Sequence, residues 1–91
     1  MARTAQDQAE DVAADAINIL AASDGKAVKV EHASPEDDID DNETERIAAG
    51  LLKDQGKSVR RWQNGLIVAD SEEAIAEWAV QTPGSETAEA V

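Results

Sequence analysis

Residues 32–46, HASPEDDIDDNETER, have the composition of an ion-binding site, with seven acids and one arginine. A calcium loop of the EF-hand type needs oxygen ligands at positions 1, 3 and 5, glycine at 6 and glutamate at 12. Counted from Asp38, positions 6 and 12 are Glu43 and Ala49, and a frame starting at Asp40 fails in the same way. We therefore expect no metal site and interpret the run as a solvated acidic connector, five of whose acids are also a candidate surface for a partner. Its members are Glu36, Asp37, Asp38, Asp40 and Asp41.

The residues that support catalysis in other proteins are scarce in this chain. His32 is the only histidine and there is no cysteine, so a zinc site or a histidine-based general base has no second ligand or partner of that kind. GLLKDQGKS, residues 50–58, ends like a phosphate-binding loop, but its glycines are one residue too far apart for that motif. We expect a protein that is not an enzyme and that needs no cofactor.

One basic and aromatic cluster interrupts an otherwise acidic chain. It consists of Lys57, Arg60, Arg61 and Trp62. One interpretation is a contact site for nucleic acid or a partner, in which the cations touch phosphates while the indole packs or stacks. In the other, which we favour, the arginines balance neighbouring carboxylates and Trp62 lies in the core opposite Ile67.

The periodicity of apolar residues predicts the elements that position these clusters. Residues 4–22 have a helical stripe made of Ala9, Val12, Ala13, Ala16, Ile17 and Leu20. Ser23-Asp24-Gly25 ends that helix. AVKVEH, residues 27–32, alternates as a half-buried strand. Helix starts are predicted at Ser34-Pro35 and, with the pattern of a capping box, at Asn42–Glu45. The second of these opens a helix over residues 43–55.

The segment SVRRWQNGLIVAD, residues 58–70, predicts a β-hairpin. Asn64-Gly65 is the preferred pair for a two-residue type I′ turn, and this register places Val59 opposite Asp70. Residues 66–69 are apolar on both faces and so form the central strand. A last helix follows, with Asp70 as its cap.

Together these elements predict a single small α+β domain over residues 1–82, with a disordered C-terminal tail over residues 83–91. A three-stranded antiparallel sheet packs against three to four helices in the order α-β-(α)-α-β-β-α. The alternative is a winged helix-turn-helix, in which residues 43–55 read DNA and residues 60–69 form the wing. The acids in and before that helix argue against it, because DNA affinity depends on neutralising phosphates.

Charge is the strongest compositional signal, at −12 from 20 acids and 8 bases. Asp7, Asp11 and Asp15 follow each other at helical spacing, which is unfavourable in dilute buffer and nearly neutral at molar salt. Alanine also replaces larger hydrophobic residues, and both features favour a halophilic organism or its virus. Without a membrane span or an apolar leader, we expect a cytoplasmic protein.

We therefore expect a small acidic protein-interaction module that contacts a protein partner or forms a homodimer. The alternatives are a winged-helix transcriptional regulator, which its charge disfavours, and an acidic DNA mimic that inhibits a nucleic-acid-binding protein.

Overall fold

The structure, a computed structural model, describes residues 4–31, 41–63 and 65–91, without the side chain of residue 41. These residues form an α+β domain, as predicted. In chain order its elements are α1 (Ala5–Ala21), β1 (Val28–Glu31), α2 (Asp41–Asp54), β2 (Ser58–Trp62), β3 (Gly65–Ala69), α3 (Glu72–Gln81), the 3₁₀ turn η1 (Ser85–Thr87) and β4 (Glu89–Ala90).

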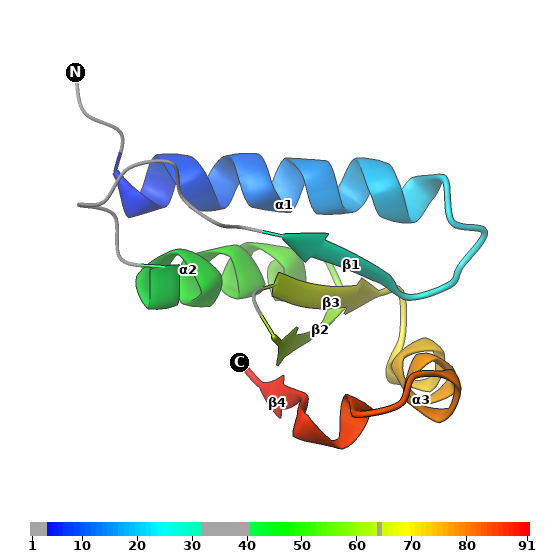
Figure 1. The fold of residues 1–91 in the computed structure, drawn as a ribbon. Coiled ribbons are helices and arrows are strands. Elements are labelled where there is room, and N and C mark those ends of the chain that lie inside the picture. Colours follow the sequence, from blue (N-terminus) through cyan, green and yellow to red (C-terminus); the bar gives the residue numbers. More distant parts are fainter. Residues whose placement is uncertain (1–3, 32–40, 64) are drawn as a thin grey trace.

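The sheet is antiparallel with the strand order β1-β3-β2-β4, and it lies between two layers of helix (Figure 1). Helices α1 and α2 cover one face, where Leu66 and Val68 of β3 join Val30 and Val59 in one apolar cluster. Because side chains alternate along a strand, Ile67 points to the opposite face, on which α3 packs. Strand β3 is therefore buried on both sides, as its continuous apolar sequence predicts.

Helix α1 follows its predicted stripe closely. Its buried residues include five that also line the predicted apolar face, and Thr4 caps it with a reciprocal capping box to Asp7. At its other end Asp24 and Gly25 both adopt positive φ, at 58° and 87°, so the chain reverses into β1.

The hairpin exists, but its predicted register is wrong by two residues. Val59 pairs with Val68 instead of Asp70, and Trp62 pairs with Gly65 instead of Ile67. The positive φ of Gln63, 54°, places the turn one residue earlier than Asn64-Gly65 predicts. A shift of two residues leaves every side chain on its predicted face, because the period of a strand is two.

Gly65 is required for a close approach between strands. A Cβ at this position would lie 2.6 Å from the carbonyl oxygen of Val30 in β1. Gly65 is the last pairing position of both β1 and β2, opposite Glu31 and Trp62. The glycine that signals the turn in the sequence therefore allows β1 to join β3.

Two further predictions about the sheet and its tail need correction. The described residues form four strands, not three, because Glu89 and Ala90 pair with β2. Residues 83–91, which we expected to be disordered, contain η1 and this strand. The sequence carries no signal for this strand, since Glu and Ala are both depleted in strands. Two residues are also too few to show an alternating pattern.

The two later helices begin one or two residues away from their predicted starts. Ser71, not Asp70, caps α3 and accepts from the backbone N–H of Ala74 at 3.2 Å. Helix α2 already includes residue 41, so Asn42 lies within its first turn and is not its cap. The predicted start at Ser34-Pro35 and the strand-end His32 lie outside the described residues.

The winged-helix alternative requires two helices joined by a turn between the first strand and the hairpin. Within the described part of that interval, residues 41–54, the chain forms one continuous helix. The first helix of that pair would begin at Ser34-Pro35, outside the described residues, so the described fold supports the coarser α+β class.

Gly65→Ala should lower the free energy of unfolding by about 1–3 kcal/mol, because the added methyl would clash with the backbone of Val30, which must then shift. Gly50→Ala is the matched control. Gly50 is an exposed residue within α2 with open space around it, so this change should stabilise by about 0.5–1 kcal/mol. Urea denaturation followed by far-ultraviolet circular dichroism measures both, and equal stabilities for Gly65→Ala and the unmodified chain would contradict the close approach.

Candidate interaction surface

The predicted acidic surface is only partly described. Glu36, Asp37, Asp38 and Asp40 lie outside the described residues, and Asp41 is the first residue of α2, where only its backbone is placed. A second set of acids lies along α1, which packs beside α2 on one face of the sheet (Figure 1). Its exposed members are Asp7, Glu10, Asp11 and Asp15. These carboxylates make the outer surface of α1 strongly negative.

The sheet separates the predicted basic cluster into two groups. Side chains alternate along β2, so Arg60 and Trp62 project from one face of the sheet and Arg61 projects from the other. Arg60 and Trp62 lie on the side of α3, and Arg61 lies on the side of α2. Lys57 precedes the strand. The four residues therefore do not form one continuous basic patch.

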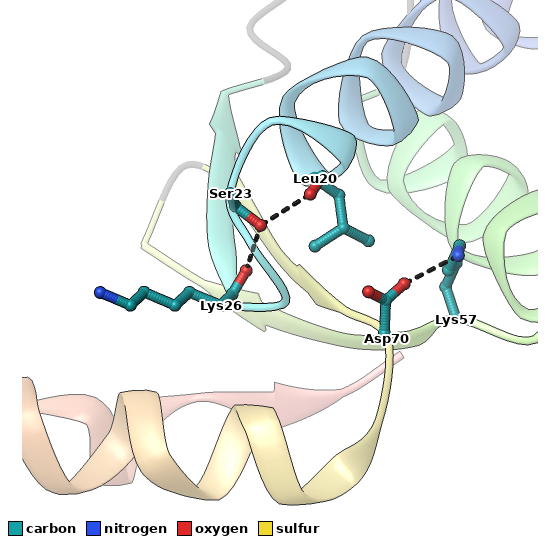
Figure 2. A network of polar contacts seen from close by, with 5 residues as sticks. All are labelled: Leu20, Ser23, Lys26, Lys57 and Asp70. Carbon is teal, nitrogen blue, oxygen red and sulfur yellow. Dashed lines mark hydrogen bonds and ion pairs between the residues drawn. The ribbon is translucent and has the colours of Figure 1, made fainter.

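Each of the three cations contacts a carboxylate of this chain. Lys57 Nζ lies 2.8 Å from Asp70 Oδ1 across the open end of the hairpin (Figure 2). Arg60 lies 3.1 Å from Glu72 Oε2 in the first turn of α3. Arg61 Nε lies 3.1 Å from Glu45 Oε2 of α2. This arrangement is the one that we favoured from the sequence, with the arginines balancing neighbouring carboxylates.

The contact with Glu45 differs from the other two in burial. The Glu45 side chain is 7% exposed, whereas those of Asp70 and Glu72 are 51% and 66% exposed. Glu45 precedes Ala48 and Leu52 by three and seven residues, so it lies on the buried stripe of α2. Sequence reasoning missed this pair, although that spacing was visible.

Trp62 packs against α3 rather than in the core opposite Ile67. Its ring meets Trp78 edge to face, with the centroids 5.1 Å apart and the planes at 80°. Lys29 Nζ lies 5.1 Å from the centroid of Trp62, a cation–π distance. Lys29 thus lies over one face of the ring, where a base would stack.

The indole N–H of Trp62 also connects the sheet to the C-terminal segment. Nε1 lies 3.2 Å from the carbonyl oxygen of Gly84 and 3.0 Å from Thr87 Oγ1, and it donates to these acceptors. Ser85 Oγ donates to the carbonyl oxygen of Ala79 at 2.8 Å. Residues 83–91 are thus fixed on β2 and α3 by specific polar contacts.

The turn between α1 and β1 contains the other polar network near the hairpin end. Ser23 Oγ lies 2.7 Å from the carbonyl oxygen of Leu20 and 2.8 Å from that of Lys26, so one hydroxyl joins both sides of the turn. Figure 2 shows the Lys26 side chain pointing away from this network. The network closes the turn and presents no group for chemistry.

No protein family matches this chain, and comparisons with curated proteins and with solved structures find no match either. Among the residues that the structure describes, no three His, Cys, Asp or Glu side chains are grouped to hold a metal ion. Nor does any helix in those ranges have the length and apolarity to cross a membrane.

Arg61→Ala should lower the free energy of unfolding by about 1–3 kcal/mol, because it removes the cation at Oε2 of a buried carboxylate. The matched change, Arg60→Ala, should cost no more than about 1 kcal/mol, because Glu72 remains hydrated. Urea denaturation at one salt concentration compares them. Equal costs would mean that burial of Glu45 does not set the strength of its pair.

Proposed function

We propose that this chain is a small acidic protein-interaction module without catalytic activity, which associates with a basic protein surface or with a second copy. One observation carries the proposal: the cations predicted to contact nucleic acid are each engaged by carboxylates of the same molecule, while the acids of α1 are exposed. Such a molecule presents a negative field to its partners, which attracts positive surfaces and repels phosphates.

The winged-helix regulator has less support. Its wing would be the hairpin β2–β3, whose Arg60 and Arg61 project from opposite faces and contact Glu72 and Glu45. To neutralise phosphates these arginines must leave their carboxylates, and the carboxylates then face the duplex. A DNA mimic, in which carboxylates replace phosphates, is a special case of the interaction module with a nucleic-acid-binding protein as its partner.

We further propose that the fold is adapted to a salt-rich cytoplasm. The exposed acids on α1 repel one another at low ionic strength, and screening removes this repulsion when the Debye length falls to roughly 3 Å at molar salt. The core offers little to offset the repulsion, because six of the fifteen buried hydrophobic residues in the described ranges are alanines, five of them in α1 and α2.

Binding to duplex DNA and to a basic DNA-binding protein, measured by anisotropy over a salt series, tests the proposed function. We expect no duplex binding at any salt concentration. Duplex binding that weakens with salt and disappears in Arg60→Ala/Arg61→Ala would refute the proposal in favour of a DNA reader. Lys26→Ala, at an exposed lysine outside the hairpin, is the control for general loss of positive charge.

Asp15→Asn should stabilise the protein by about 0.2–0.5 kcal/mol in dilute buffer, because it removes the like-charge pair with Asp11 one helical turn earlier. The gain should vanish at molar KCl. Asn18→Asp, which adds an acid three residues after Asp15 on the exposed side of α1, should have the opposite sign and the same salt dependence. Urea denaturation at both salt concentrations measures the effects, and a gain that persists at molar salt would exclude charge repulsion as its cause.

A further inference from the structure

The C-terminal segment lies on β2 in the way that an added peptide strand binds a sheet edge. In Figure 1, β4 runs beside β2 at one edge of the sheet. It pairs antiparallel with β2 at two positions, Ala90 opposite Arg60 and Glu89 opposite Arg61. Main-chain pairing of this kind gives affinity in strand addition, and side-chain pockets give specificity.

The residue after the strand makes the two contacts that would anchor such a peptide. The Val91 side chain is partly buried against the main apolar cluster. Its carbonyl oxygen accepts a hydrogen bond from Lys53 Nζ, near the end of α2. The apolar cluster thus holds the side chain of Val91, and the ammonium group of Lys53 holds its main-chain oxygen.

Basic side chains are concentrated around this segment. Four of the eight Lys and Arg residues of the chain adjoin residues 85–91, although the net charge is −12. They are Arg46, Lys53, Arg60 and Arg61. The segment itself carries Glu86 and Glu89, so its charge is complementary to theirs, while Glu45 and Glu72 on the opposing elements offset part of the positive charge.

The segment does not fill the site. A hollow of about 270 Å³ remains between the first half of α2, Arg61 of β2 and the end of the chain, lined by Asn42, Glu43, Glu45, Arg46, Arg61, Ala90 and Val91. Strand β4 also covers only two of the five residues of β2. The site is therefore a groove with a short occupant, not a closed part of the core.

We propose that the groove between α2 and the outer edge of β2 is a peptide-binding site, occupied here by residues 89–91 of the same chain and, in a self-associated form, by the same residues of a second copy. Exchange of a terminal element preserves every contact that it makes within one chain, so it is a low-cost route to a dimer. Pro83 and Gly84, the latter at φ 85°, precede the segment and provide the point at which its path changes.

This inference rests on the proposed interaction function and names the surface and the partner. Its first test uses the full chain with Ala90→Pro/Val91→Asp, which weakens strand pairing and the apolar anchor and so opens the groove. A labelled peptide of residues 85–91, SETAEAV, should bind this variant at least tenfold more tightly than it binds the unmodified chain, where the tethered segment competes at about millimolar effective concentration.

Adding Lys53→Ala to the opened variant should weaken the peptide at least tenfold, whereas adding Lys26→Ala, at a lysine outside the groove, should not change its affinity. Far-ultraviolet circular dichroism establishes that each variant is folded. A folded, opened variant that does not bind the peptide, or binds it regardless of Lys53, overturns the proposal.

A second test keeps β4 pairing intact in both chains, so it does not depend on the opened variant. Lys53→Glu impairs the groove but leaves the segment, and Val91→Asp impairs the segment but leaves the groove. Sedimentation equilibrium should find each variant monomeric alone and a one-to-one complex in the mixture. If either variant alone associates as strongly as the unmodified chain, the groove is not the site of self-association. The proposed interaction function would not be affected by that result. If neither the unmodified chain nor the mixture associates, the proposed exchange of the C-terminal segment between two copies is wrong. Binding to a basic protein tests the proposed function separately.

Discussion

Burial of β3 on both faces is the constraint on which the rest of the structure depends. Leu66, Ile67, Val68 and Ala69 have no solvent exposure, although the chain is short of large hydrophobic residues. One strand can be sheltered on two sides only if helices from distant parts of the chain cover both. Helices α1 and α2 shelter one side and α3 shelters the other, so a five-residue strand determines the arrangement of the three layers. The narrow space beside Gly65 then fixes how closely β1 can approach.

The charge distribution follows from this arrangement. Strand β2 brings its arginines to the two sides of the sheet, and each side has an acid from a different helix in reach: Glu45 from α2 and Glu72 from α3. A positive cluster in the sequence thus becomes a set of internal links between layers. Part of the negative charge that remains is carried by four exposed acids of α1, Asp7, Glu10, Asp11 and Asp15.

The sequence predicted those elements that have a strong period or a strong terminator. The stripe of α1, its end at Asp24-Gly25, and the doubly buried β3 were all found in this way. The register of the hairpin was missed because the turn rule considers only two strands, whereas Gly65 also serves the third. The C-terminal strand was missed because its stability comes from the surface that it meets and not from its own two residues. The pair of Arg61 and Glu45 was missed for a related reason: it depends on how β2 crosses α2.

The contact between Trp62 and Trp78 has a practical consequence for observing this molecule. These are its only two tryptophans, and it has no tyrosine or phenylalanine, so its near-ultraviolet absorption and intrinsic emission arise from one place, the junction of β2 and α3. That optical signal reports most directly on the contact between the sheet and α3. Far-ultraviolet dichroism, by contrast, is dominated by α1 and α2, the two longest helices. Comparing the two signals during unfolding therefore shows directly whether the layers on either side of β3 separate together or in sequence.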